Sequence, residues 1–328
     1  MLNKNQKLNK KLFDKDVEKE LIRNGFGDGL LEAGEKNKNV VVLTADLRES
    51  VKIDKFVEKF PERFFEVGIA EQNLVSVASG MASVGKIPFA TSYAIFSPGR
   101  NWEQIRTNIC YNNTNVKIIG SHAGLSVGPD GGSHQALEDI ALMRVLPRMQ
   151  IVVPCDSIEA KKATIAMVKT DGPQYLRLIR EKSPLITTED SPFEIGKANI
   201  LFESENPQVL IISCGPIIYN ALISAKKLEE EGIGSIVLNL HTIKPIDREK
   251  IIELAKKTNA VVTIEDHQIA GGLGSAVAEV LAENFPIPIR FIGIKDEFGQ
   301  SGNPEELYKH YGLDSESITE TIKKFLGK

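Results

Sequence analysis

Short apolar runs alternate with longer helix-like stretches along almost the whole chain, and this alternation limits the fold more than any other feature. In the first half the strand-like runs are NVVVLTAD (39–46), RFFEV (63–67), PFATS (88–92), NVKIIGS (115–121), MQIVVP (149–154) and QYLRLI (174–179). The helix-like stretches are 17–35, 71–84, 99–111, 135–145 and 157–169. Strands separated by helices predict an α/β fold, a mostly parallel sheet with helices on both faces.

The same alternation resumes later and predicts a second domain. Residues 182–207 are rich in Pro, Ser, Thr and acids, which is typical of a linker with room for a small hairpin. After them come the strand-like runs QVLIIS (208–213), SIVLNL (235–240), NAVVTIED (259–266) and IPIRFIG (287–293), with helix-like stretches at 217–231, 247–257, 273–284 and 315–327. The chain of 328 residues is long enough for two cores. We expect a polar lead-in over 1–15, a first domain over 16–190 and a second over 191–328.

Composition excludes several classes of partner. The net charge is −4, which gives no electrostatic reason to expect nucleic acid. No apolar run approaches the roughly 20 residues of a membrane span. The first twenty residues are lysine-rich but contain acids and no Arg, so they are unlike a transit peptide and predict a solvated lead-in to a helix. Cys110, Cys155 and Cys214 are widely separated, which indicates a cytoplasmic chain without disulfides.

A glycine-rich turn in the second domain has two possible explanations. GGLG (271–274) follows the run VVTIED and opens a helix, as a dinucleotide-binding loop would. The full G-x-G-x-x-G pattern is missing, and no acid ends a strand at the usual distance downstream. We therefore expect a tight turn. Glu265, Asp266 and His267, just before it, are expected to form a polar cluster at a domain edge.

The loop GSHAGLSVGPDGGSHQALED (120–139) is the strongest candidate for a functional loop. It lies after the carboxyl end of a predicted strand, where open α/β sheets bind ligands. Its length and glycine content do not suit a core. His122 and His134, with Asp130 between them, suit proton transfer or hydroxyl binding. A metal site is the competing explanation, and the lack of a third His or Cys nearby disfavours it.

A second candidate is the stretch FFEVGIAEQNLVSVASGMA (64–82), where a strand-like start runs into a helix of small residues. Glu71 stands at the join. An acid at a helix N-terminus is favoured by the helix dipole, and this is the simplest explanation of its position.

Three segments together resemble the pyrimidine-binding domain of transketolase. They are GIAEQN (68–73), SYAIFSPGRNWEQIR (92–106) and SHAGLSVGPDGGSHQ (121–135). The stretch VVTIEDHQIAGGLGSAVAEVL (261–281) is similar to the transketolase C-terminal domain, and the resemblance covers nearly the whole chain from about residue 16. It implies thiamine diphosphate as cofactor. It also implies transfer of a two-carbon ketol unit from a ketose phosphate to an aldose phosphate.

The resemblance assigns cofactor roles to particular residues. The glutamate matching Glu71 hydrogen-bonds N1′ of the cofactor's aminopyrimidine ring, which favours the tautomer that removes a proton from the thiazolium C2. Tyr93 and Phe96 match aromatic residues around that ring, where an aromatic face can stack. Asp46, which ends a strand, aligns with a residue near the cofactor.

The resemblance also implies a substrate site. His122 and His134 match histidines that contact substrate hydroxyls and assist proton transfer, and Asp130 matches an aspartate that binds a sugar hydroxyl. Ser50 and Arg180 match positions that bind the acceptor's phosphate, and the arginine fork meets phosphate oxygens in bidentate fashion.

Full-length transketolases also have an N-terminal domain that binds Mg²⁺ and the diphosphate, using GDG followed about thirty residues later by Asn. Here GDG (27–29) lies within a helical pattern and no Asn occurs between 40 and 72, so we interpret it as a glycine-rich helix face. The resemblance therefore implies the C-terminal subunit of a split transketolase. A partner subunit would hold Mg²⁺ and the diphosphate, in a hetero-oligomer of two copies of each chain.

Other functions stay open from the sequence. A 1-deoxyxylulose-5-phosphate synthase has arginines at the positions matching Phe96 and His122, and the beta subunit of a 2-oxoacid dehydrogenase has a different histidine cluster, so both are disfavoured. A non-catalytic scaffold subunit would not need Glu71, His122, Asp130 and His134. An oxidoreductase built on residues 259–281 would need the dinucleotide loop that the pattern lacks.

Overall fold

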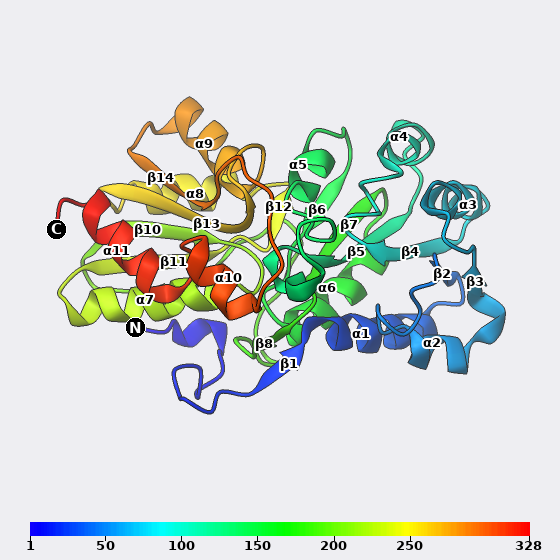
Figure 1. Ribbon diagram of the computed structural model, residues 1–328, viewed down its shortest axis with the longest axis horizontal. Coiled ribbons are helices and arrows are strands. Elements are labelled where there is room, and N and C mark those ends of the chain that lie inside the picture. Colours follow the sequence, from blue (N-terminus) through cyan, green and yellow to red (C-terminus); the bar gives the residue numbers. More distant parts are fainter.

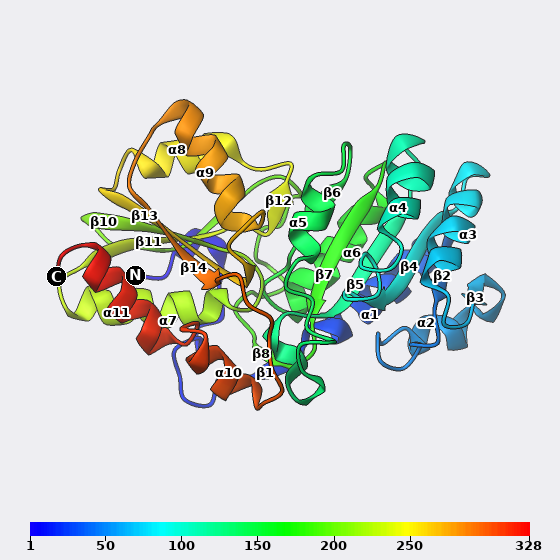
Figure 2. The same ribbon diagram turned by 45° about the horizontal axis from the view of Figure 1, so that its top comes forward.

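The computed structural model describes all 328 residues as two α/β units placed side by side (Figure 1). The first unit occupies the right half of the view and the second unit the left half. Both chain ends lie on the second unit (Figures 1 and 2). The predicted α/β class, with two mostly parallel sheets covered by helices, is confirmed.

The first sheet has seven strands in the order β12-β6-β7-β5-β4-β2-β3. Every neighbouring pair is parallel except β12 and β6. The strands are β2 (Val40–Thr44), β3 (Phe64–Glu66), β4 (Ile87–Tyr93), β5 (Lys117–Ala123), β6 (Gln150–Val152), β7 (Gln174–Ile179) and β12 (Thr242–Lys244). Their β-branched and aromatic residues suit a sheet that is covered on both faces.

Helices cover both faces of this sheet (Figures 1 and 2). One face holds α1 (Ile22–Lys36), α2 (Asp54–Lys59) and α6 (Ser157–Val168), and the other holds α3 (Glu71–Ser83), α4 (Trp102–Gln104) and α5 (Asp139–Arg144). The GDG segment lies within α1 as expected. Gly25 and Gly29 allow α1 to pack against α6, since a Cβ on Gly25 would lie 1.7 Å from the Ser157 carbonyl oxygen and one on Gly29 would lie 2.7 Å from the Lys161 carbonyl oxygen. Gly27 faces the Lys52 carbonyl instead. Asp28 pairs with Lys55 at 2.6 Å on the surface.

The second sheet has five strands in the order β14-β13-β10-β11-β9. They are β9 (Asn199–Glu203), β10 (Pro207–Ser213), β11 (Gly234–Asn239), β13 (Ala260–Gln268) and β14 (Ile289–Ile294), and only the edge strand β9 is antiparallel. The helices α7 (Ile218–Glu230), α10 (Pro304–His310) and α11 (Ser315–Phe325) lie on one side. On the other side lie α8 (Arg248–Ala255) and α9 (Leu273–Asn284).

Several element boundaries differ from the sequence-based expectation. The helix expected over 17–35 begins at Ile22, because residues 19–21 form β1 (Lys19–Leu21), which pairs antiparallel with β8 (Lys182–Pro184). The linker therefore contains no hairpin, since β8 pairs with β1 and β9 joins the second sheet. The helix expected over 99–111 is the short α4 followed by a π-helix (Ile105–Tyr111), and the one expected over 135–145 is reduced to α5.

The expectation of a solvated lead-in is wrong for its apolar side chains. Leu12 is fully buried in the core of the second unit, and Leu2 and Phe13 pack against that core. The Met1 carbonyl accepts a hydrogen bond from the backbone N–H of Glu203. Apolar residues spaced along a lysine-rich segment supply enough contact for the chain to follow the surface of the second unit.

The two units share one packed interior. The largest cluster of buried apolar side chains contains Ile118 and Ile151 of the first sheet together with Leu210 and Leu238 of the second. Strand β12 belongs by sequence to the second half of the chain, but it pairs with β6 in the first sheet. The boundary at 190/191 stays a prediction, because the chain crosses back at β12.

Candidate active site

The carboxyl ends of five adjacent parallel strands meet along one edge of the first sheet. For β7, β5, β4, β2 and β3, in spatial order, the residues at or just beyond these ends are Arg180, His122, Tyr93, Asp46 and Glu71, respectively. Five of the residues singled out from sequence therefore follow the same edge, where α/β sheets bind ligands.

Glu71 is the first residue of α3 and is only 5% exposed. Its Oε1 accepts a hydrogen bond from Arg100 Nη1 at 3.1 Å, and Asn101 Nδ2 donates to its carbonyl at 2.9 Å. Its second carboxylate oxygen has no partner within the chain. A buried carboxylate that uses only half of its hydrogen-bonding capacity is costly, so the free oxygen is suited to a ligand's donor group.

Arg100 links this carboxylate to a pair of aromatic rings. The ring centroids of Tyr93 and Phe96 are 6.0 Å apart with an interplanar angle of 17°. The Arg100 guanidinium lies 4.1 Å from the centroid of the Phe96 ring. Arg100 therefore joins Glu71 to the aromatic pair through a hydrogen bond on one side and a cation–π contact on the other.

His122 lies near the end of β5 with a positive φ of 54°. Its ring stacks on Tyr93 at 3.9 Å, its Nδ1 is 2.8 Å from Ser121 Oγ, and its Nε2 is 3.4 Å from Arg23 Nη1. Burial, together with the charges of Arg23 and Arg180, lowers the pKa of His122 to about 3. The ring is therefore neutral near pH 7. Because arginine can only donate, Nε2 is the acceptor and Nδ1 carries the proton.

Arg23 was missed from the sequence and is central to the site. It is 7% exposed, donates through Nη1 to the Ser50 carbonyl, and donates through Nη2 to the Arg180 carbonyl at 2.7 Å. The available signal was its spacing, because Arg23 stands three residues before Phe26 and seven before Leu30, on the buried side of α1. A charged residue on an apolar helix face is rarely buried without a partner.

The glycine-rich loop adds two more predicted residues, Asp130 and His134. Arg180 Nη1 lies 3.2 Å from Asp130 Oδ2 and donates to the Val127 carbonyl at 2.6 Å. His134 meets the Phe96 ring edge-to-face at 5.6 Å, and its Nδ1 is 3.0 Å from Ser133 Oγ. An unbroken series of contacts thus runs from Glu71 through Arg100, Phe96, Tyr93, His122, Arg23 and Arg180 to Asp130.

Two predicted residues, Asp46 and Ser50, do not join this series of contacts through their side chains. Asp46 is exposed with a φ of 60°, and its backbone N–H donates to Glu66 Oε1 at 2.9 Å, so no contact joins it to the aromatic pair. Ser50 takes part through its carbonyl, which Arg23 holds, and its hydroxyl makes no hydrogen bond within the chain.

The polar cluster at 265–267 is buried where the second unit meets the first, since Asp266 Oδ1 accepts a hydrogen bond from the Leu125 N–H and His267 Nε2 accepts one from the Ala141 N–H. The Glu265 carboxylate accepts hydrogen bonds from the backbone N–H groups of Leu273 and Gly274 at 2.7 and 2.8 Å. It therefore occupies the N-terminus of α9, where a dinucleotide phosphate would bind. The tight turn expected for 271–274 is confirmed.

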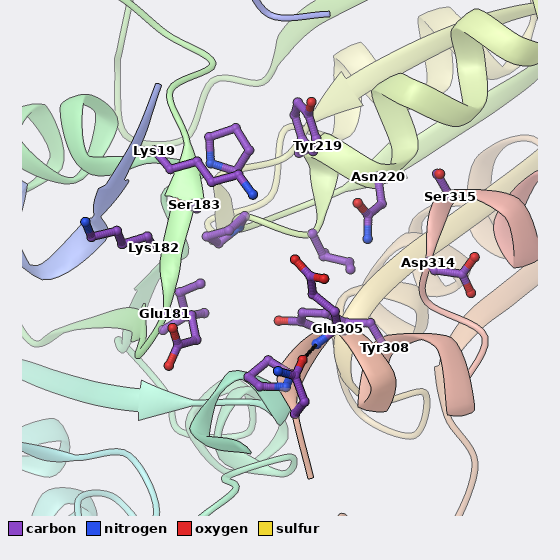
Figure 3. Close-up of a pocket in the computed structure, with 16 residues that line it drawn as sticks. Lys19, Glu181, Lys182, Ser183, Tyr219, Asn220, Glu305, Tyr308, Asp314 and Ser315 are labelled. Atoms are coloured by element: carbon purple, nitrogen blue, oxygen red, sulfur yellow. Dashed lines mark hydrogen bonds between the residues drawn. The ribbon is translucent and has the colours of Figure 1, made fainter. Parts of the chain in front are cut away.

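A cavity of about 590 Å³ lies between the two units, away from Glu71 (Figure 3). Figure 3 shows Lys19 and Lys182 on one side of this cavity and Tyr219, Asn220 and Asp314 on the other. None of the sequence-predicted site residues lines it, although Ile179 and Glu181 flank Arg180. We place the candidate site at the strand edge, because the side chains able to do chemistry converge there.

No group of three or more His, Cys, Asp or Glu side chains is arranged to hold a metal ion. The three cysteines are free and buried. None of the helices has both the length and the apolar character needed to cross a bilayer.

Comparison with known proteins agrees with this geometry. The pyrimidine binding domain of transketolase matches residues 19–184, and the transketolase C-terminal domain matches residues 196–318. A "Putative transketolase C-terminal section" from Methanocaldococcus jannaschii is 45% identical over 310 residues, which cover 94% of this chain and 96% of that protein.

Two further relatives also match this chain over nearly their whole length. A "6-deoxy-6-sulfo-D-fructose transketolase subunit" from Clostridium sp. is 39% identical over 306 residues, covering 93% of this chain and 94% of the relative. A solved structure described as "Split gene transketolase, inactive beta4 tetramer" has a TM-score of 0.87 and 46% identity, and the match covers 94% of this chain and 98% of that chain.

The chain belongs to the transketolase family and consists of its pyrimidine-binding and C-terminal domains. Membership of this family implies thiamine diphosphate as cofactor. The residues present fit its aminopyrimidine ring, because the largely buried Glu71 offers a carboxylate oxygen without a partner, and Arg100 links it to the aromatic pair Tyr93 and Phe96.

Proposed function

We propose that this chain supplies the pyrimidine half of a transketolase active site that transfers a two-carbon ketol unit from a ketose phosphate to an aldose phosphate. A second chain holds the diphosphate and Mg²⁺. The observation that carries this proposal is the Glu71 carboxylate, which is buried, held by Arg100 on one oxygen and free on the other, next to Tyr93 and Phe96.

Bound thiamine diphosphate supplies an electron sink for cleavage of a carbon–carbon bond. Through its free oxygen Glu71 would share a proton with a ring nitrogen of the bound cofactor, and Arg100 fixes the carboxylate's orientation. Phe96 and Tyr93 present ring faces to the flat heterocycle, and Asp46 contributes at the outer edge of the cofactor site. This chain thus orients the cofactor's ring and exchanges one proton with it.

The end of the site that holds His122, Arg23 and Arg180 suits the sugar substrate. His122 is neutral and can exchange hydrogen bonds with hydroxyl groups, while His134 and Asp130 stand on the facing loop. Arg23 and Arg180 are joined at the Arg180 carbonyl and place two positive charges beside Ser50. Planar guanidinium groups bind phosphate oxygens in pairs, so this end is assigned to the substrate's phosphate.

A sulfonate is the alternative anion. One relative is described as a 6-deoxy-6-sulfo-D-fructose transketolase subunit, and a sulfonate presents three oxygens much as a phosphate does. The two arginines bind either group. We propose the phosphorylated sugar as donor, with the sulfonated sugar as the competing substrate.

Partner dependence follows from the incomplete site. A solved relative is described as an inactive beta4 tetramer. We propose that the isolated chain likewise assembles with itself and is inactive, and that the active form contains two copies of each chain. The cytoplasmic location expected from the separated cysteines stays a prediction.

Reconstitution tests the proposal. The purified chain is mixed with an N-terminal transketolase section, thiamine diphosphate and Mg²⁺, and transfer from fructose 6-phosphate to an aldose phosphate is followed. The same assay is run with 6-deoxy-6-sulfofructose as donor. We expect ketol transfer only when both chains are present. Robust turnover by this chain alone, or none by the mixture with either donor, would contradict the proposal.

A further inference from the structure

We call the glycine-rich loop of residues 120–139 the substrate loop. Four of its glycines face the second unit of the chain. A Cβ on Gly132 would lie 2.4 Å from the Gly299 carbonyl oxygen, and one on Gly131 would lie 2.5 Å from Ser301 Oγ. Gly124 and Gly128 meet Asp266 and Pro304 in the same way, at 2.1 and 3.1 Å. A Cβ on Gly132 would clash with backbone, and one on Gly124, Gly128 or Gly131 would crowd a side chain. The glycines therefore allow the second unit to approach closely the loop that carries Asp130 and His134.

The segment of the second unit that contacts this loop is held in place by hydrogen bonds to the rest of the second unit. We call residues 295–304 the brace. Gln268 Nε2 donates to the Glu297 carbonyl at 2.7 Å, and the backbone N–H of Asp296 donates to Gln268 Oε1 at 3.0 Å. The Tyr311 hydroxyl donates to the Phe298 carbonyl at 3.1 Å. The brace is thus anchored to the second unit at several points before it meets the first.

Hydrogen bonds also cross between the two units at the loop. Gln135, which follows His134 and is buried, donates through Nε2 to the Gln300 carbonyl at 3.1 Å. At the other end of the loop, the Leu125 backbone N–H donates to Asp266 Oδ1 at 3.0 Å, and the Tyr308 hydroxyl donates to Asp266 Oδ2 at 3.2 Å. Tyr308 belongs to α10, which continues from the brace and lines the cavity of Figure 3.

We infer that the second unit positions the substrate loop, with the brace and Gln135 setting where Asp130 and His134 stand. This inference rests on the proposed function and gives the C-terminal domain a role in it. Gln135 is a positioning residue, because it acts through its neighbour His134 and through the backbone of the brace. Displacing groups that bind a substrate by about 1 Å can cost on the order of 100-fold in rate.

The variant Gly132→Ala tests this inference. Gly132 does not have a positive φ, so alanine strains no dihedral angle there, and its only conflict is with the Gly299 backbone. Gly80→Ala is the matched control, since a Cβ on Gly80 meets nothing within 4 Å. Gln135→Met, which keeps the side chain's length and removes the donor, is the second variant in case Gly132→Ala does not fold.

The first readout does not depend on activity. Amide hydrogen exchange is measured across residues 124–135 in the unmodified chain and in the three variants. We expect Leu125 and its neighbours to exchange at least about tenfold faster in Gly132→Ala and Gln135→Met than in Gly80→Ala, because opening of the loop becomes easier. Unchanged protection would overturn the inference, whatever the complex catalyses.

The second readout separates positioning from general damage in the reconstituted complex. Hydroxypyruvate carries the same ketol carbons as a ketose phosphate but releases CO₂, so it has no hydroxyl-bearing leaving group for Asp130 or His134 to bind. We expect Gly132→Ala to lower kcat/KM for fructose 6-phosphate about 10- to 100-fold and to leave hydroxypyruvate nearly unchanged. Equal losses with both donors would overturn positioning, whereas inactivity of the unmodified complex with both donors counts against the proposed function instead.

Discussion

At the residue scale, the site is built on charges that the fold leaves partly unsatisfied. Glu71 has one carboxylate oxygen without a partner, and the buried Arg23 has an Nε without one. Such groups reduce stability in the free chain, since each lacks part of the hydrogen bonding that water would supply. A ligand with a hydrogen-bond donor would complete the free oxygen of Glu71.

Replacing Glu71 by Gln tests the proton role of this carboxylate. The amide keeps the shape of the side chain but exchanges the proton with a ring nitrogen poorly, so kcat should fall by roughly 10²- to 10⁴-fold. Turnover is measured in the reconstituted complex, and light scattering checks that the complex stays assembled. Glu62→Gln, at an exposed position, serves as control. Undiminished turnover in Glu71→Gln would favour a scaffold role.

His122 makes the free energy of unfolding depend on pH. Its folded pKa of about 3 lies below the ordinary value of 6.5, so the unfolded chain binds the proton first as the pH falls. Stability is therefore lost progressively below pH 6.5 and regained as the pH rises. Between pH 7 and pH 5 this one ring should account for about 2 kcal/mol.

Urea unfolding of the unmodified chain and of His122→Gln at both pH values measures that contribution. The difference in unfolding free energy between pH 7 and pH 5 should be about 2 kcal/mol smaller in the variant. The same difference in both chains would mean that His122 titrates normally in the folded state.

Most of the candidate-site residues that the structure brings together were predicted from the sequence, and one was missed for a physical reason. Glu71, Tyr93, His122 and Arg180 all lie at or just beyond the carboxyl ends of strands, so parallel pairing alone brings them to one edge. Arg23 stands on a helix across the sheet's face, and its contacts with Ser50 and the Arg180 carbonyl depend on tertiary packing. No local pattern reports contacts between residues so far apart in the chain.

At the element scale, the closest helix contact depends on glycine. Gly25→Ala places a methyl group against the Ser157 carbonyl, at a spot where a Cβ would lie 1.7 Å from that oxygen. Helix α1 has to move away from α6, and the free energy of unfolding should fall by about 1–3 kcal/mol despite alanine's better helix propensity. Urea unfolding of the isolated chain measures it.

Gly80→Ala is the control for that measurement. This helical glycine in α3 has open space around it, so alanine should raise stability by up to about 1 kcal/mol. A Gly25→Ala chain as stable as the Gly80→Ala chain would show that α1 and α6 are not in close contact.

Elements were predictable where the pattern is local. The buried strands and amphipathic helices of both sheets follow from hydrophobic period and length, which depend on neighbouring residues. The β1–β8 pair joins residues 19–21 to 182–184, and β12 crosses to the first sheet. Such pairings depend on the whole fold, so short polar segments like KEL and KSP carry no sign of them.

At the scale of the whole molecule, the shared interior predicts that the two units unfold together. One cluster of 35 buried residues spans both sheets, and β12 ties the second half of the chain to the first. Calorimetry of the chain should therefore show one unfolding transition rather than two. Two resolved transitions would mean that the units are independent domains.

We propose that this chain binds the aminopyrimidine end of thiamine diphosphate while a different chain binds the diphosphate end. The most direct test is a structure of the reconstituted complex with the cofactor bound. We predict a Glu71 carboxylate oxygen within about 2.6–3.2 Å of an aminopyrimidine nitrogen, with the diphosphate held by the other chain. A Glu71 side chain turned away from the ring, or a cofactor enclosed by this chain alone, would contradict the account.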